Sequence, residues 1–351
     1  MSQKLRTGII GTGVISKEHL AFLQQSEQSQ LVGVCDLSAA AAQYAAQKFE
    51  ADAAYTNYKE MLDKAKPHVV HILTPPNTHQ FLATDCLKAG AHVICEKPIT
   101  PTYESFKELW DLAQTCDRHL IEDYNYLFNE PILAINEKLQ SGELGEIQDV
   151  DIRVVLNVRE GGRFADENLP NPVHRLPAGV IHDVITHMCY LALQYLPSVD
   201  RVGAVWSNHG GGDLFKYDDL DALVIGDSVH ARLRFSHSTW PECFEVKVRG
   251  NKGYVETDLF QPYVRTVVPR SGGKQLTPLI NHFSSGVSFM GASASNFRNK
   301  IMQKTPYEGL TRFLHLTYTA LRENKPLPVT FEMMERTNRL IDTLLQEKYC
   351  L

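Results

Sequence analysis

Two polar residues interrupt an apolar segment near the middle of the chain. Residues 179–187 read GVIHDVITH, and Asp183 and His187 are four positions apart, so on a helix they share one face. Polar groups on such a face are costly to bury unless they are paired or open to a cleft. A carboxylate beside an imidazole holds its orientation and favours its charged form, which suits a group that accepts a hydroxyl proton. A structural pair that satisfies itself is the alternative.

A lysine stands directly after a second apolar run. Lys97 lies between Glu96 and Pro98, just beyond the strand predicted over residues 91–95. Ligands of open parallel sheets collect at the carboxyl ends of the strands. An ammonium there can hydrogen-bond a substrate hydroxyl and stabilise negative charge that develops on its oxygen. The alternative is a solvated lysine in a turn.

The elements that must position these groups begin with a strand, a glycine turn and a helix. The apolar run over residues 5–10 predicts a buried strand, and helical spacing resumes at Ile15. Gly11 would make the tight turn and Gly13 would let the backbone approach a pyrophosphate at the helix N-terminus. Ser16 replaces a third glycine but is small enough for close packing. The predicted phosphate-binding residues are Gly11, Thr12, Gly13, Val14 and Ile15.

An acidic residue ends the second predicted strand, residues 31–36. Asp36 lies 23 residues after Gly13, close to the roughly 20 expected of the group that binds the ribose hydroxyls. A carboxylate there accepts hydrogen bonds from two hydroxyls and repels a 2′-phosphate, so the sequence predicts NAD rather than NADP. The alternative is a strand-terminal aspartate that caps the next helix.

The order of the predicted elements divides the chain in two. Strands and helices alternate through residue 123, which predicts a doubly wound parallel sheet of the Rossmann type over residues 1–123. Strands with no helix between them follow from 199 to 258, so residues 124–351 are predicted to form an α+β domain with a large, mostly antiparallel, open-faced sheet. Residues 265–304 are polar and rich in glycine and serine, and no element is assigned to them. Helices are predicted over 131–141, 178–196, 307–323 and 331–347.

Composition excludes several classes of function. The 351 residues carry a net charge of −6, which offers no basic field for nucleic acid, and no apolar run approaches the roughly 18 residues of a membrane span. A first strand near residue 5 leaves no room for a signal peptide, and seven cysteines without tight pairing motifs fit a reducing cytoplasm. We therefore expect a cytoplasmic protein. His174, His182, Asp183 and His187 lack metal-site spacing, so no metal is predicted, and no Gly-x-Ser-x-Gly motif supports a serine nucleophile.

These motifs together resemble those of the glucose–fructose oxidoreductase / inositol dehydrogenase family (Gfo/Idh/MocA). The resemblance rests on Gly11-x-Gly13, Asp36, Glu96-Lys97-Pro98 and Gly179-x-x-x-Asp183-x-x-x-His187, in this order and spacing. It extends over essentially the whole chain, including residues 249–253 and the closing helices.

The resemblance implies roles for particular residues. His187 would be the acid/base, Asp183 would orient the substrate, and Lys97 would contact substrate and cofactor. Further cofactor contacts are implied for Glu96 and for the loop after the fourth strand, at Thr74, Pro75, Asn77 and His79. The resemblance also implies a homodimer or homotetramer that associates through the exposed face of the second sheet.

Two stretches depart from the family pattern. Where family members often carry an arginine near the start of the second domain, residues 124–129 read YNYLFN, and Asn125 is the substrate-binding candidate there. The loop over 159–176 carries Arg163, His174 and Arg175, and the guanidinium groups of the two arginines would suit a carboxylate or phosphate. This favours an acidic or nucleotide-linked sugar, with a solvated basic loop as the alternative.

The sequence thus predicts an NAD(P)-dependent dehydrogenase. Its substrate would be a small molecule, a sugar, cyclitol or related polyol that exchanges a hydride with nicotinamide at a secondary alcohol or the matching ketone. One alternative is a sugar hydrolase or lyase that retains NAD for transient oxidation. A second is a non-catalytic cofactor-sensing protein, against which the joint presence of Lys97, Asp183 and His187 argues.

Overall fold

A computed structural model of the chain describes residues 4–158, 164–166, 171–210, 214–270, 273–302, 307–346 and 348–350. The chain forms two compact units, which we describe one at a time. The first comprises residues 1–125, 175–177 and 307–339, and the second comprises residues 126–174, 178–306 and 340–351. Both units are therefore discontinuous in sequence, whereas the two predicted functional domains are continuous stretches.

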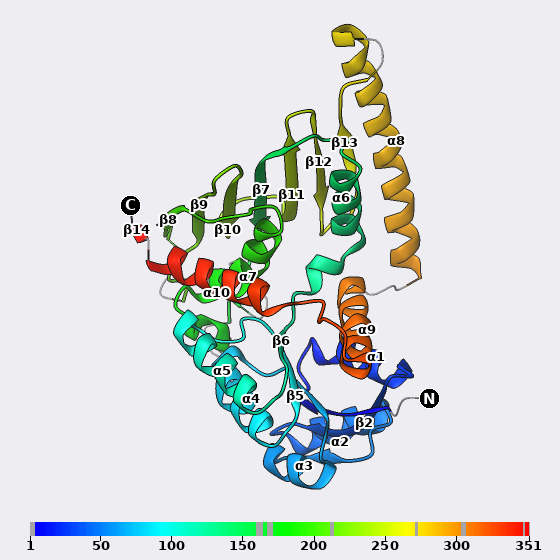
Figure 1. Ribbon diagram of the computed structural model, residues 1–351, viewed down its shortest axis with the longest axis vertical. Helices are drawn as coiled ribbons and strands as arrows, with labels where there is room; N and C mark the ends of the chain where they lie inside the picture. Colours follow the sequence, from blue (N-terminus) through cyan, green and yellow to red (C-terminus); the bar gives the residue numbers. More distant parts are fainter. Residues whose placement is uncertain are drawn as a thin grey trace. The chain divides into compact units, whose positions relative to one another are not determined.

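The first unit is built on a six-stranded parallel sheet, sheet A, in the order β3-β2-β1-β4-β5-β6 (Figure 1). This order is that of a doubly wound dinucleotide-binding fold, and it confirms the predicted Rossmann architecture. The central strands are almost continuously buried because helices cover both faces of such a sheet. The strands are β1 (Leu5–Ile10), β2 (Ser29–Cys35), β3 (Ala54–Tyr55), β4 (Val69–Ile72), β5 (His92–Cys95) and β6 (Leu120–Glu122).

Five helices connect these strands, and their ends follow local sequence signals. Ser38 and Thr102 cap the second and fifth through their side chains, and Asn57 caps the third. The helices are α1 (Ser16–Gln25), α2 (Ala39–Lys48), α3 (Tyr58–Ala65), α4 (His79–Lys88) and α5 (Tyr103–Thr115), with a short 3₁₀ turn, η1 (Pro76–Thr78), before α4.

Two segments from the end of the chain complete the first unit. α9 (Glu308–Glu323) packs on α1, and the hydroxyl of Tyr318 lies 2.8 Å from Oγ1 of Thr7. The first half of α10 (Phe331–Gln346) reaches the end of β6, where the side-chain amide of Asn338 donates to Glu122. The sequence predicts both helices, but local patterns do not indicate that they pack against sheet A.

The second unit is built on an eight-stranded sheet, sheet B, in the order β13-β12-β11-β7-β10-β9-β8-β14. Two pairs, β7 with β10 and β8 with β14, are parallel, and the others are antiparallel. The predicted mostly antiparallel sheet is thereby confirmed. Its strands are β7 (Ile147–Val155), β8 (Arg201–Ser207), β9 (Asp219–Ile225), β10 (His230–Ser236), β11 (Cys243–Gly250), β12 (Gly253–Asp258), β13 (Arg265–Val267) and β14 (Lys348–Cys350).

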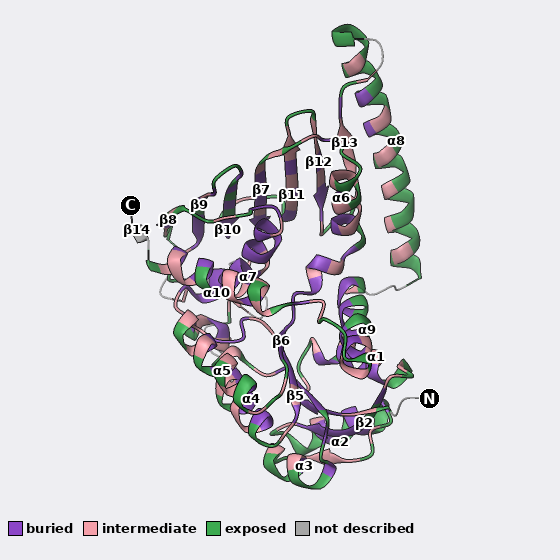
Figure 2. Ribbon diagram, in the orientation of Figure 1, coloured by how far each residue is buried: buried purple, intermediate pink, exposed green. Residues whose placement is uncertain are grey.

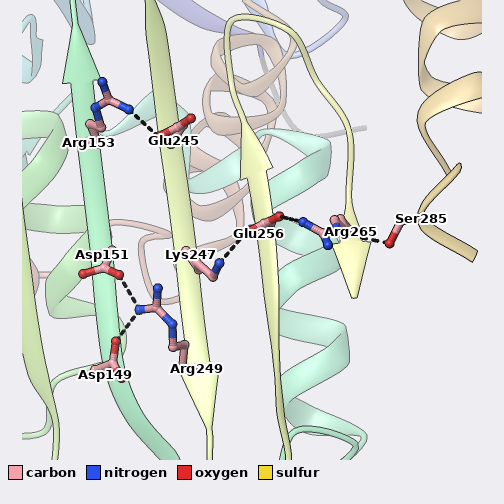
Figure 3. A network of polar contacts seen from close by, with 9 residues as sticks. All are labelled: Asp149, Asp151, Arg153, Glu245, Lys247, Arg249, Glu256, Arg265 and Ser285. Atoms are coloured by element: carbon pink, nitrogen blue, oxygen red, sulfur yellow. Dashed lines mark hydrogen bonds and ion pairs between the residues drawn. The ribbon is translucent and has the colours of Figure 1, made fainter. Parts of the chain in front are cut away.

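Burial alternates along these strands because only one face of sheet B is covered. α7 (Gly179–Leu193) packs on β7 and β10, and α6 (Glu130–Gln140) packs on β12. Two 3₁₀ turns, η2 (Asn125–Phe128) and η3 (Pro172–Arg175), precede these two helices. The other face carries ion pairs that run from β7 through β11 and β12 to β13 (Figure 3).

A long helix lies where the sequence indicates no element. α8 (Gly273–Ile301) is 29 residues long and contacts β13 (Figure 1). Glycine and serine are weak helix formers, so local propensity alone does not indicate it. Among the described residues, no helix is both long enough and apolar enough to cross a membrane.

Candidate functional site

The glycine turn after β1 has the geometry that the sequence predicts. Gly11 has a φ of +97°, and a Cβ on it would lie 2.7 Å from the carbonyl oxygen of Leu73, so a larger residue would clash with the backbone of the neighbouring strand end. A Cβ on Gly13 would meet no described heavy atom within 4 Å, which leaves its outer side open. Ser16, at the place of the third glycine, donates its hydroxyl hydrogen bond to the carbonyl of Gly13 over 2.6 Å. The serine thus fixes the turn instead of loosening it.

The N-terminus of α1 retains donors for an anion. Ile15 is the cap residue, and among the described residues no side chain caps this helix end. The preceding Val14 is 65% exposed. Unsatisfied N–H groups and the positive end of the helix dipole favour a phosphate at such a position. The turn therefore fits the pyrophosphate of a dinucleotide.

Asp36 stands just beyond β2 and faces the glycine turn. Its Oδ2 accepts hydrogen bonds from the backbone N–H of Thr12 (2.9 Å) and from its hydroxyl (2.7 Å), and Oδ1 accepts from the N–H of Ser38 (2.9 Å). Burial by itself raises the pKa of Asp36, but these hydrogen bonds outweigh it and hold the pKa below the usual value. The residue is therefore an ionised carboxylate beside the turn, as a ribose-binding group must be.

The loop after β4 is held by a buried histidine. The two ring nitrogens of His79 lie 2.9 Å from the carbonyl oxygen of Pro98 and 2.8 Å from that of Thr74. The imidazole thereby connects the loop after β4 to the loop after β5. Pro75 and Asn77 are exposed, and Thr74 is half-buried with its hydroxyl 2.6 Å from that of Thr78. Within this loop the exposed positions are the ones open to a ligand, and His79 holds the loop in place.

Acidic side chains gather around Lys97 at the carboxyl ends of β5 and β6. Glu96 follows β5, Glu122 ends β6, and Asp123 comes next. Burial raises the pKa of Glu122 and, together with the nearby charge of Glu96, raises that of Asp123 well above its usual value. The charge of Lys97 acts in the opposite direction on all three carboxylates. Lys97 therefore lies among three carboxylates, and its charge lowers the pKa of each.

A row of polar side chains leads from these carboxylates into the first unit. Nε2 of His19 lies 3.6 Å from a carboxylate oxygen of Glu96 and 3.6 Å from one of Asp123. The other ring nitrogen of His19 lies 2.9 Å from Nδ1 of His71, whose Nε2 is 2.9 Å from the hydroxyl of Tyr318. His19, His71, Asp123 and Tyr318 are fully buried, and the side chain of Glu96 is 14% exposed. The sequence analysis missed this group; two histidines inside apolar runs were the only local signal.

The same cluster has donors that could hold a metal ion. One ligand atom each from His19, Glu96 and Asp123 lie within 4.8 Å of one another, the one such group among the described residues. A histidine between two carboxylates satisfies the same geometry without an ion, since each contact at 3.6 Å is an ion pair when the imidazole carries a proton. The four residues considered for a metal in the sequence are not part of this group.

In the second unit, α7 presents Asp183 and His187 as its two accessible positions. Gly179–Leu193 is otherwise buried on every side, and these two residues alone are half-buried. Gly179, at the start of the helix, has a φ of +57°. Because the two side chains lie one turn apart, they open on the same face of the helix. The predicted pairing of positions is thus present on one accessible strip.

Two tyrosines position the imidazole of His187. The hydroxyl of Tyr190 lies 2.7 Å from Nδ1, and the ring of Tyr126 packs against the imidazole with 4.6 Å between ring centroids. Tyr190 hydroxyl also accepts from the backbone N–H of Tyr126 (3.3 Å). The sequence analysis missed both partners, although Tyr190 is three positions from His187 and could have been found from helical spacing.

The remaining substrate candidates that the structure describes are divided between the two units. Asn125 is buried at the end of the first unit, and no described group hydrogen-bonds its Oδ1. In the second unit, Nε2 of His174 lies 2.8 Å from the carbonyl oxygen of Phe164, and its ring packs on Phe215. Arg175 is exposed and falls in the first unit. Arg163 lies outside the described residues.

Comparison with known proteins supports the cofactor half of this description. Residues 5–124 match the family model described as an oxidoreductase family with an NAD-binding Rossmann fold. The chain is 31% identical to D-glucoside 3-dehydrogenase of Escherichia coli (strain K12) over 208 residues, 58% of each protein. It is 25% identical to inositol 2-dehydrogenase of Rhizobium meliloti over 287 residues, 80% of this chain and 83% of the relative. The chain spans about half the length of the curated relatives that it matches at 30% identity or more.

Solved structures share the fold over nearly the whole chain. An NAD-binding oxidoreductase from Klebsiella pneumoniae superposes with a TM-score of 0.79 at 16% identity, covering 98% of this chain and 97% of that one. The 3-ketoreductase KijD10 of Actinomadura kijaniata gives a TM-score of 0.77 at 16% identity, with 99% of both chains covered. At this identity the likeness establishes the fold.

Residues 5–124 of the first unit are therefore an NAD-binding Rossmann fold of the kind that this oxidoreductase family model describes. The family match and the named relatives confirm the resemblance to the Gfo/Idh/MocA family that the sequence predicts.

Proposed function

We propose that this protein is an NAD-dependent dehydrogenase that oxidises a secondary hydroxyl of a glucoside or cyclitol, or reduces the matching ketone. The substrate class follows from the printed activities of two relatives, a glucoside 3-dehydrogenase and an inositol 2-dehydrogenase. The observation that carries the proposal is the accessible strip of α7, on which an otherwise buried helix opens only at Asp183 and His187.

The residues that would hold the cofactor fit a dinucleotide. Gly13 and the uncapped N-terminus of α1 would bind the pyrophosphate, and the ionised carboxylate of Asp36 would accept the ribose hydroxyls. Asp36 would repel the 2′-phosphate of NADP, which supports NAD as the preferred cofactor. When bound, the nicotinamide accepts or donates the hydride.

His187 would move the hydroxyl proton of the substrate. Tyr190 engages Nδ1 of the ring, so the proton would be exchanged at Nε2. The ring of Tyr126 keeps the imidazole in one orientation, which matters because proton transfer needs the base within hydrogen-bond reach of the hydroxyl. Asp183, one turn away, would accept a second substrate hydroxyl and orient the sugar ring.

Lys97 would act on the substrate oxygen and on the cofactor. Its ammonium would donate to the oxygen and stabilise the negative charge that develops there as the proton leaves. It would serve as an electrostatic group and His187 as the base. The exposed residues of the loop after β4, together with Glu96, would complete the cofactor contacts.

A screen with a matched pair of variants tests this proposal. Purified protein is incubated with NAD or NADP and a panel of glucosides, inositols, and acidic or nucleotide-linked sugars, and reduced nicotinamide is followed by its absorbance. We expect reduction of NAD with at least one glucoside or cyclitol. His187→Asn should lower kcat by about 10²–10⁴-fold. His230→Asn, which changes an exposed histidine at the start of β10, should leave kcat unchanged.

Three results would count against the proposal. Turnover of a sugar without net reduced nicotinamide would indicate transient oxidation by a retained cofactor. Binding of NAD with no turnover of any substrate in either direction would favour a cofactor-sensing protein. An unchanged kcat in His187→Asn would remove this histidine from the proton transfer.

A further inference from the structure

The helix α8 is attached to sheet B by its polar side. Asn281 donates its side-chain amide to the carbonyl of Val268 over 2.8 Å, and Ser288 donates its hydroxyl to the carbonyl of Val264 over 2.7 Å. Oγ of Ser285 accepts a hydrogen bond from Nε of Arg265 over 3.0 Å. This is the last contact of the polar network on sheet B (Figure 3). The buried residues of α8 are therefore polar, and these bonds determine which side of the helix faces outward.

The outward side of α8 is apolar. Leu279 and seven other large side chains there are 40% to 76% exposed, and Figure 2 shows most of this helix as exposed or half-buried. Such a helix is inverted relative to an ordinary surface helix, whose apolar stripe faces the core. An exposed apolar stripe of this size indicates an interaction surface.

The stripe follows a heptad rather than an average helical period. Its positions are separated by alternating steps of four and three residues, the spacing that lets two helices pack along one seam. At about 100° per residue, every position lies within about 60° of the direction opposite Asn281 and Ser285, and all but Ile280 lie within about 40° of it. We call these eight positions the seam: Leu276, Ile280, Phe283, Val287, Met290, Ala294, Phe297 and Ile301.

The seam is complementary to itself in one direction. If two copies of α8 lie antiparallel about a two-fold axis between residues 288 and 289, Phe283 faces Ala294 and Val287 faces Met290, so a large side chain meets a small one. A parallel pair would set Phe283 against Phe283 and leave a gap between two copies of Ala294. Antiparallel pairing also opposes the two helix dipoles favourably.

The exposed area is sufficient for a specific contact. A large apolar side chain has about 200 Å² of surface. The seven large side chains of the seam and Leu279 expose on average somewhat more than half of this surface, which is roughly 900 Å² in all. A standard interface buries about 800 Å² per partner. We propose that two copies of this chain associate through α8, seam against seam and antiparallel.

Cysteine cross-linking of the full-length protein tests the register. The double variant Phe283→Cys/Ala294→Cys should form a disulfide-linked dimer under mild oxidation, because these positions face each other across the pair. Each single variant should not, since the two copies of either residue would be about 16 Å apart along the axis. The native cysteines are the same in all three proteins. A dimer formed by Phe283→Cys alone would overturn the antiparallel arrangement.

Sedimentation at micromolar concentration tests the association itself. Phe283→Glu/Phe297→Glu should halve the mass of the wild-type assembly while retaining NAD binding, which reports that the first unit is folded. His282→Glu, an exposed change about 100° around the helix from Phe283, should keep the wild-type mass. Equal masses for the wild type and the double variant would overturn the proposal. The proposal would also be overturned if the double variant kept the wild-type mass but lost binding to anionic lipid vesicles. The seam is flanked by Lys274, Arg298 and Lys300, so this result would indicate that it contacts a membrane surface.

Discussion

Acidic side chains of the first unit gather at the carboxyl ends of parallel strands and face N–H groups, hydroxyls and a histidine, whereas those on the open face of sheet B face arginine and lysine. Asp36 accepts from Thr12 and Ser38, and Glu122 accepts from the N–H of Ile99. On sheet B, Arg249 contacts both Asp149 and Asp151, and Glu256 lies 2.7 Å from Lys247 and from Arg265 (Figure 3).

This difference changes the protonation of the same residue types. Burial and the charge of Glu96 raise the pKa of Asp123, while the arginines beside Asp151 outweigh burial and lower its pKa. A carboxylate that already pairs with arginine or lysine has little remaining capacity to bind a ligand. Buried acids with few cations are costly to keep, and strongly shifted groups of this kind concentrate at functional sites. The comparison therefore supports a structural role for the network on sheet B, and it fits the proposed role of the first unit's strand ends in binding cofactor and substrate.

Removal of the charge of Lys97 should have the largest effect. We expect Lys97→Met to lower kcat/KM by about 10³-fold, because the developing charge on the substrate oxygen loses its partner. Lys97→Arg should recover part of the activity. Lys247→Met removes a lysine of the sheet B network and should change kcat/KM less than about twofold. Steady-state kinetics of the three variants checks this, and equal losses for Lys97→Met and Lys247→Met would break the comparison.

Asp36 should determine the preference for NAD over NADP. Asp36→Ser removes a charged acceptor for the ribose hydroxyls, so the ratio of kcat/KM with NAD to that with NADP should fall by about 10–100-fold. Asp151→Ser, which changes a carboxylate of the network, should leave the ratio as it is. If Asp36→Ser leaves the ratio unchanged as well, Asp36 is not the ribose-binding group.

Asp123 should lower the free energy of unfolding at neutral and alkaline pH. Its pKa is raised in the folded state, so between the unfolded and folded values the folded protein binds more protons, and stability falls as pH rises through that window. Asp123→Asn should therefore be more stable than the wild type at pH 8, by about 1–3 kcal/mol, and should lose this advantage in acid. Urea unfolding of the protein without cofactor at the two pH values measures it. A lower stability of the variant at pH 8 would contradict the assignment.

The effect of Asp151 on stability should depend on pH in the opposite direction and should be smaller. Its pKa is lowered in the folded state, so its contribution is present above the unfolded value and is lost as pH falls through the folded value. Asp151→Asn should cost about 0.5–1 kcal/mol at pH 7 and less at high salt, because the network faces solvent. The urea midpoint at low and high ionic strength measures this cost. An effect that does not respond to salt would show that the network is not solvent-screened.

Local sequence patterns were sufficient to predict which strand ends of the first unit carry the candidate cofactor-binding residues. The glycine turn, Asp36 and Lys97 each follow a buried strand, and the parallel order of the sheet brings such strand ends to one edge. The pair on α7 could be predicted because helical spacing alone puts Asp183 and His187 on one face.

Contacts between distant segments were beyond reach of the sequence. His19 and His71 are 52 residues apart, and His71 and Tyr318 are 247 apart, so no spacing rule connects them. α8 was missed because its glycine and serine content hides the helix and because its apolar side faces outward. Sequence patterns predict which residues an element can bury, and α8 does not bury the residues that the pattern would indicate.

The most direct test follows the hydride itself. A glucoside or inositol that the protein turns over is labelled with deuterium on the carbon that is oxidised, and the reduced nicotinamide is analysed by mass spectrometry. We expect one deuterium in each reduced nicotinamide with the wild type, and about 10²–10⁴-fold slower formation of the same product with His187→Asn. Reduced nicotinamide without deuterium, or product sugar with no reduced nicotinamide, would contradict the proposed dehydrogenase.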